Sequence, residues 1–168
     1  MNTKKLTVLS MLTAMALIIF IVEAQLPPLA PVPGIKMGLS NVVTLVTLAL
    51  FGRKEAFAVL MLRIVLGSIF AGQMMSFMYS MAGGLMCFLV MALTLPVLKK
   101  QLWIVSVFSA LAHNAGQIAV AVFITGTWQI IGYMPILIIS AVITGAFTGT
   151  AAGFCVKRIT AVKGRKYR

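Results

Sequence analysis

Six apolar runs, separated by short polar or turn-forming segments, make up most of the chain. They cover about residues 6–22, 38–52, 55–71, 74–98, 102–124 and 134–156. A helix that crosses a bilayer needs about 20 residues, with a range of roughly 17–25. The second and third runs are short for that purpose, and the others fit it. The pattern predicts an all-α integral membrane protein with six transmembrane helices, a single membrane domain over residues 1–168 and a basic tail at 157–168.

The composition agrees with a chain that lies in lipid. Hydrophobic residues make up 61% of it, charged residues only 10%, and the mean hydropathy is +1.09. Soluble domains are about 45–50% apolar and about 25% charged. One domain of this length cannot hide so much apolar surface from water, so the bilayer is its expected solvent and partner.

The basic residues predict the orientation of the helices. If the N-terminus is cytoplasmic, Lys36 is the only Lys or Arg in an outer loop, and Arg63 lies inside a helix. The inner loops and ends then hold Lys4, Lys5, Arg53, Lys54, Lys99, Lys100, Lys157, Arg158, Lys163, Arg165, Lys166 and Arg168. This bias follows the positive-inside rule. We expect a multi-pass protein of the cytoplasmic membrane with both termini inside and a tail near anionic lipid, not on nucleic acid.

The first apolar run loosely imitates a signal peptide, because Lys4 and Lys5 precede it. Its length, about 17 residues, exceeds the roughly 7–15 that are usual for such a signal. We expect a retained first helix.

The acidic residues limit the chemistry that the chain can perform. The sequence contains Glu23 and Glu55 and no Asp. Paired-carboxylate hydrolysis needs two suitably spaced acids, and Mg²⁺-dependent transfer of phosphoryl or prenyl groups needs Asp or Glu to hold the metal. The sequence also has no Gly-rich phosphate loop ending in Lys-Ser/Thr. We therefore expect no enzyme activity, no metal site and no cofactor.

Arg63 is the first candidate for a ligand-binding residue. It lies eight residues after Glu55, which places it about 12 Å along a helix. A charge at such a depth is costly and must face the bundle interior or a water-filled cavity. Snorkelling or pairing with helix carbonyls is the structural alternative. Since no intramembrane acid is expected, an anionic ligand is the favoured counter-charge.

The fifth run supplies three more polar side chains. His113 and Gln117 are four residues apart, Asn114 and Gln117 three apart, so all three are expected on one helical face. His113 lies about 16 Å from the start of its run, within a turn of the depth of Arg63. Interhelical hydrogen bonding is the alternative to ligand binding. The sequence favours one cavity lined by these residues and Arg63.

The first outer loop, residues 26–41, is rich in proline and glycine. Its prolines make it stiff and extended. We expect it to act as a lid over a cavity that opens outward, although a plain connector would have the same composition. Lys36 and Asn41, near the outer end of the second helix, complete the predicted set of substrate-binding residues: Lys36, Asn41, Arg63, His113, Asn114 and Gln117.

Small residues at a spacing of four indicate close helix packing. Gly145, Gly149 and Gly153 form two overlapping GxxxG patterns. Ser10 and Ala14 form a weaker patch on the first helix, which serves either a partner subunit or internal packing.

Several blocks resemble the Gx transporter family, which is also labelled heptaprenyl diphosphate synthase component I. They are PGIKMGLSN at 33–41, LRIVLGS at 62–68, SMAGG at 80–84, AHNAGQ at 112–117, YMP at 133–135 and GAFTG at 145–149. The resemblance covers about residues 8–156. That family is similar in turn to the substrate-binding S-components of energy-coupling factor (ECF) vitamin transporters, six-helix proteins that work with a membrane scaffold and two ATPases.

This resemblance implies an S-component-like subunit. It would take up a small ligand, either anionic or related to isoprenoids or quinones, with ECF-type scaffold and ATPase partners. The alternative is a non-catalytic membrane subunit of a polyprenyl diphosphate synthase or of a quinone or electron-transfer pathway. Because the chain has no Asp, it would be only the partner of such a synthase.

Overall fold

The computed structural model describes residues 3–26, 36–72, 74–98 and 101–163, and within these ranges every regular element is helical. The α-helices are α1 (Thr3–Ala24), α2 (Asn41–Phe51), α3 (Arg53–Ala71), α4 (Met74–Thr94), α5 (Leu102–Thr125) and α6 (Met134–Lys163). A short 3₁₀ helix, η1 (Trp128–Tyr133), precedes α6. The prediction of one helix for each apolar run is confirmed.

Four of these helices are long and apolar enough to cross a membrane: α1, α4, α5 and the η1–α6 stretch. This finding indicates a membrane protein. The other two do not meet the same test, because α2 has only 11 residues and α3 carries Arg53, Lys54, Glu55 and Arg63. The predicted count of six spans is therefore supported for four helices only.

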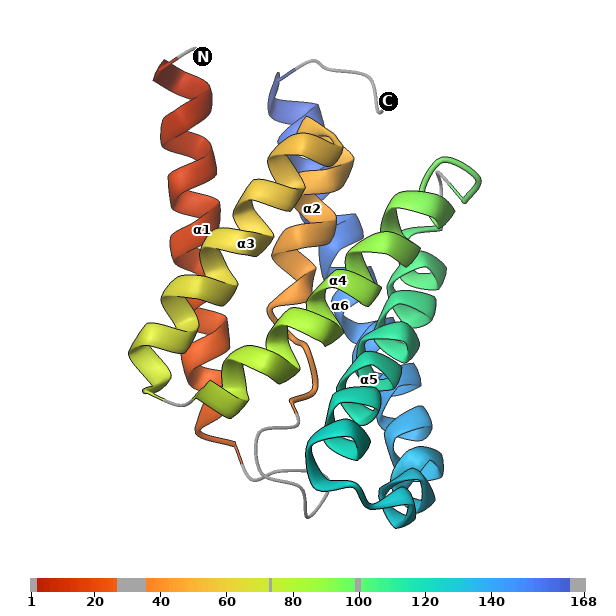
Figure 1. Cartoon of the computed structure of the whole chain (residues 1–168). Helices are drawn as coiled ribbons and strands as arrows, with labels where there is room; N and C mark the ends of the chain where they lie inside the picture. The colour runs from red at the N-terminus through yellow and green to blue at the C-terminus, as the bar shows by residue number, and fades with distance from the viewer. Residues whose placement is uncertain (1–2, 27–35, 73, 99–100, 164–168) are drawn as a thin grey trace.

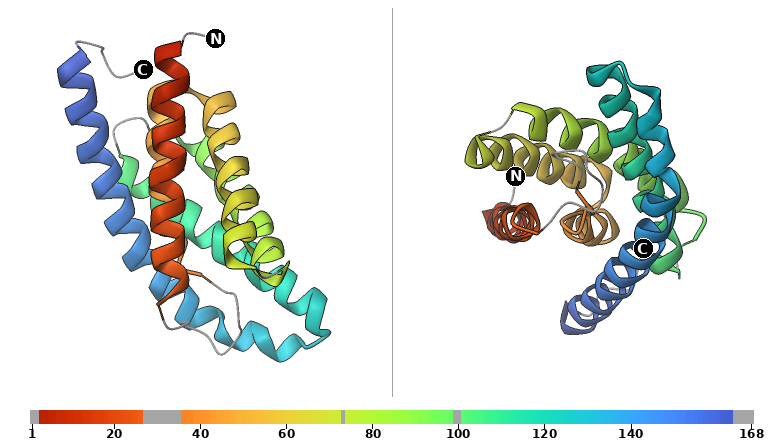
Figure 2. Two further views of the ribbon diagram at one scale, coloured as in Figure 1. Left: turned by 90° about the vertical axis from the view of Figure 1, so that its left-hand side faces the viewer. Right: turned by 90° about the horizontal axis from the view of Figure 1, so that it is seen from below.

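The helices form a bundle with both chain ends on the same side (Figure 1). α1 and α2 are nearly antiparallel, so that both are seen end-on from below, and α6 diverges from α1 toward the end of the bundle where α1 begins (Figures 1 and 2). α2 contacts α1, α3, α4 and α6. This short helix therefore lies at the centre of the bundle, and it is buried along most of its length.

Glycines determine where α2, α3 and α5 end. Gly52, between α2 and α3, has φ +100°, and Gly72 and Gly126 adopt the left-handed conformation just after α3 and α5. Glycine has no Cβ and adopts such angles without strain. The sharp turns fold α3 back beside α2 and lead α5 into η1.

α6 packs against α5 through two of the three glycines in its GxxxG patterns. A Cβ on Gly145 would lie 2.7 Å from the Cα of Val107, and one on Gly149 would clash with the Cα of Trp103. A Cβ on Gly153 would meet no atom within 4 Å. The predicted close packing thus holds for the first pattern, and Gly153 lies beyond the contact.

Most helix ends lie within about three residues of the sequence-based boundaries, and two differ by more. α4 ends at Thr94, before the predicted limit at 98, and turns follow it. α6 continues past the predicted limit at 156 to Lys163, so the basic tail begins as helix. Ser10 and Ala14 are exposed on α1, which argues against the internal packing alternative. Their contact with a partner subunit stays a prediction.

Candidate functional site

A carboxylate at the end of α1 holds the segment that leads into α2. Glu23 is only 5% exposed, and one of its oxygens accepts a hydrogen bond from the backbone N–H of Gly38. Gly38 has φ +78°, and a Cβ there would lie 2.7 Å from the Asn41 amide nitrogen and 3.0 Å from the His113 ring. Glycine is required here by both the backbone angle and the space.

Arg63 projects from α3 toward the start of α2. Its guanidinium donates hydrogen bonds to the Ser40 hydroxyl and, at 3.1 Å, to the Asn41 side-chain oxygen. Arg63 is 2% exposed and interacts electrostatically with Glu23. This corrects the expectation that no intramembrane acid neutralises Arg63. Glu23, which the sequence pattern placed in a connecting segment, is buried in the bundle and supplies that charge.

His113 joins α2 to α5. One ring nitrogen lies 3.3 Å from the Asn41 amide nitrogen, and the other lies 3.0 Å from the Gln117 amide nitrogen. A Cβ on Gly83 of α4 would lie 2.8 Å from the His113 ring. The small residue on α4 therefore lets the imidazole fit between the three helices.

Lys36 anchors the other end of the segment. Its ammonium donates to the Ser76 hydroxyl at 2.8 Å and lies 3.5 Å from the centre of the Phe20 ring, and its backbone N–H donates to the Gln117 side-chain oxygen at 3.3 Å. Lys36 is thus held by side chains from α1, α4 and α5.

The structure brings five of the six predicted residues into one connected network and leaves one outside it. Lys36, Asn41, Arg63, His113 and Gln117 are linked by the contacts above. Asn114 instead donates to the backbone oxygen of Leu137 at 2.8 Å, on α6. The shared-face expectation fails for Asn114 because neighbouring helical positions point about 100° apart. Asn114 therefore joins α5 to α6.

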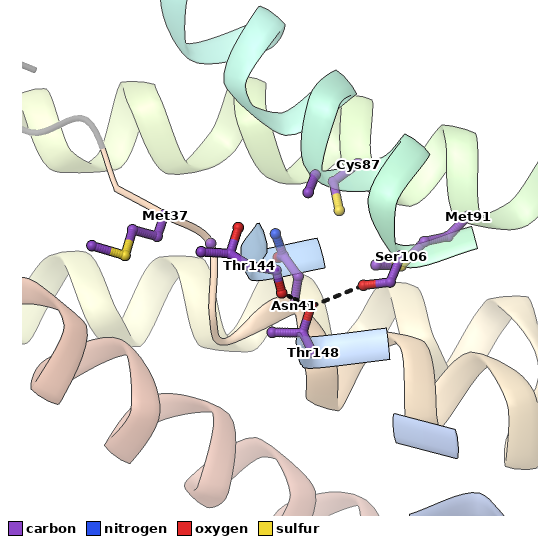
Figure 3. Close-up of a pocket in the computed structure, with 9 residues that line it drawn as sticks. Met37, Asn41, Cys87, Met91, Ser106, Thr144 and Thr148 are labelled. Atoms are coloured by element: carbon purple, nitrogen blue, oxygen red, sulfur yellow. Dashed lines mark hydrogen bonds between the residues drawn. The ribbon is translucent and has the colours of Figure 1, made fainter. Parts of the chain in front are cut away.

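A small cavity lies beside this network, between α2, α4, α5 and α6 (Figure 3). Asn41 belongs both to the network and to the lining of the cavity. The cavity has room for about one water molecule. Hydroxyl, sulfur and methyl groups line the rest of it; Ser106 and Thr148 bond to each other at 2.9 Å across it. A larger guest requires a movement of the surrounding segments. The prolines of the predicted lid, at positions 27–33, lie outside the described residues.

Comparison with protein families identifies the chain. The family model described as heptaprenyl diphosphate synthase component I matches residues 12–155. The chain belongs to this family. No curated protein and no solved structure is significantly similar to it. The matched range includes every residue of the network, so the site lies within the part that defines family membership.

Several residues of the site in this family member were not identified from the sequence. All three of Glu23, Ser40 and Ser76 are buried. Ser40 accepts a hydrogen bond from Arg63 and Ser76 one from Lys36, whereas Glu23 accepts one from the Gly38 backbone. Ser106, Thr144 and Thr148 contribute to the cavity. Glu23 had one available signal, since it is one of only two acids in the sequence. The sequence contained no such signal for the serines and threonines. Their hydroxyl groups often bond to the backbone of their own helix, so their presence in an apolar segment does not indicate a site.

Proposed function

We propose that this protein is the ligand-binding membrane subunit of an uptake system. The observation that carries the proposal is the buried network of Lys36, Asn41, Arg63, His113 and Gln117. Buried ionisable groups in a membrane bundle are costly, and they mark ligand or ion pathways more often than packing. Interhelical bonds in the network also hold the bundle together, so the binding role rests on its position beside the cavity.

In this proposal the chain has six membrane-crossing helices and both termini in the cytoplasm. α2 is about 16 Å long at helical rise, too short to cross the bilayer alone. It crosses together with residues 36–40, which are packed against α1 and α5 through Glu23 and Gln117. Non-helical backbone is tolerated at membrane depth where it is buried in protein.

The ligand enters from the outside, and residues 26–41 close over it. The cavity between α2, α4, α5 and α6 is lined by neutral groups, which suits the uncharged part of a ligand. Arg63 and Lys36, in the network beside the cavity, suit an anionic group on the same ligand. An ECF-type scaffold and ATPase subunits power the uptake, since the sequence contains no Gly-rich phosphate loop of its own.

The name of the family favours a second function. A component I of heptaprenyl diphosphate synthase is a subunit, and this chain, with two acids and no Asp, would be the non-catalytic one that holds a soluble synthase at the membrane. In that case the network is a structural feature, or a site for the synthase's product.

Purification from native membranes distinguishes the two functions. Uptake predicts co-purification of a membrane scaffold and ATPases; the accessory role predicts a soluble, Asp-rich synthase. Mass spectrometry of small molecules retained by the protein tests the site directly. The Arg63→Met/Glu23→Gln double variant, which removes both opposite charges, should lose the retained molecule, and Met78→Leu, a partly exposed position on α4, should keep it. Equal retention by both variants would place the ligand elsewhere.

A further inference from the structure

The start of α2 has the features of an anion-binding site. Successive N–H groups at a helix N-terminus, together with the helix dipole, favour a negative charge. Here the Gly38 N–H donates to Glu23, and the Ser40 N–H also interacts with that carboxylate. Arg63 and Lys36 add two positive charges to the same place.

Polar atoms without a partner show that this site is incomplete. The second carboxylate oxygen of Glu23 and the Nε of Arg63 are buried, and neither has a hydrogen-bond partner among the described residues. A buried charged group that keeps an unused donor or acceptor carries a free-energy cost. Glu23 thus accepts only some of the hydrogen bonds that Arg63 and the N–H groups at the start of α2 can donate.

We propose that Glu23 is an internal carboxylate that occupies the anion position of this site, and that the ligand is a monocarboxylate that takes its place. This inference rests on the proposed function and names its ligand class. The charges support a single negative group, because Glu23 is part of α1 and its charge stays nearby after the exchange. Arg63 and Lys36 supply two positive charges and Glu23 one negative charge, so one positive charge is left for the ligand. A diphosphate would bring more negative charge than this surplus balances.

Exchange of the two carboxylates couples binding to movement. Glu23 lies on α1, and its bond to Gly38 ties residues 36–41 to that helix. When a ligand carboxylate accepts the Gly38 N–H and pairs with Arg63, this link to α1 is lost. The segment then moves as the cavity enlarges around the body of the ligand.

Chemical rescue tests the anion position with a defined probe. Glu23→Ala removes a group that matches acetate in size and charge. We expect sodium acetate to raise the melting temperature of the purified variant by about 2–4 °C over sodium chloride at equal ionic strength. Glu55→Ala is the matched control, because Glu55 is the only other acid and pairs with Lys5 at the α1–α3 contact. It should show no difference between the salts.

Several outcomes would overturn the proposal. They are no acetate effect on Glu23→Ala, an equal effect on Glu55→Ala, and rescue by inorganic diphosphate but not by acetate. Rescue combined with co-purification of a synthase would instead keep the carboxylate site and reject the uptake function. The two proposals can therefore fail separately.

Thiol labelling tests the link to α1 and does not depend on the stability of Glu23→Ala. The background variant is Cys155→Ser, which removes the exposed native thiol. In this background the cysteine introduced by Met37→Cys should react about 10- to 100-fold faster with a polar maleimide when Glu23→Gln is added. The reason is that Glu23→Gln weakens the charge-assisted hydrogen bond from the Gly38 N–H. A cysteine introduced by Gln129→Cys, in η1, should react at the same rate with or without Glu23→Gln. An unchanged rate at position 37 would refute the link.

Discussion

Glu23 and Arg63 form a buried pair of opposite charges whose energetic coupling can be measured. Both are almost fully buried, at 5% and 2% exposure, and they interact electrostatically. Removing one member of such a pair leaves an uncompensated charge and typically costs about 3–5 kcal/mol. Removing both members relieves that cost.

Arg63→Met has a second cost that can be assigned to particular atoms. The Ser40 hydroxyl and the Asn41 side-chain oxygen each lose a donor, and both residues are buried. An unsatisfied buried polar group costs about 1–3 kcal/mol. Glu23→Gln keeps these two bonds and weakens the one to Gly38.

The double variant should therefore be far more stable than additivity predicts. We expect each single variant to lose about 3–5 kcal/mol and Arg63→Met/Glu23→Gln to lose about the same, so that the coupling free energy is about 3–5 kcal/mol. Unfolding in mixed micelles with increasing dodecyl sulfate, followed by far-UV circular dichroism, measures all four proteins. Met78→Leu should stay within about 0.5 kcal/mol of the parent.

Additive effects would refute this reasoning. If the double variant loses the sum of the two single losses within about 0.5 kcal/mol, the two charges do not compensate each other. Arg63 would then be held by Ser40 and Asn41 alone.

A further prediction concerns the packing of α6 on α5. Gly149→Ala should destabilise the protein by about 1–3 kcal/mol, because its Cβ would meet the Trp103 backbone at the α5–α6 contact. Gly153→Ala, four residues away, should be neutral or stabilising, because its Cβ meets no neighbouring atom. Equal effects of the two variants in a thermal melt would contradict this reasoning.

The positions of the helices could be predicted from the sequence. Long apolar runs must satisfy their backbone groups within the segment when they lie in lipid, so length and hydropathy were enough to place six helices. The cost of burying a charge also singled out Arg63 as an inward-facing residue, and spacing placed His113 beside Gln117.

The contacts between polar groups of different helices could not be predicted from the sequence. Glu23 lies 40 residues from Arg63 in the sequence, and no periodicity within one helix reports a contact between the end of one helix and the middle of another. The same holds for Asn114, which was expected on the face of His113 and Gln117 but donates to the Leu137 backbone of α6. Helix packing sets these contacts through small residues such as Gly83 and Gly149, which let particular faces approach. The helices can be predicted from the apolar runs in the sequence. The counter-charge of Arg63, which is Glu23, depends on how the helices pack together.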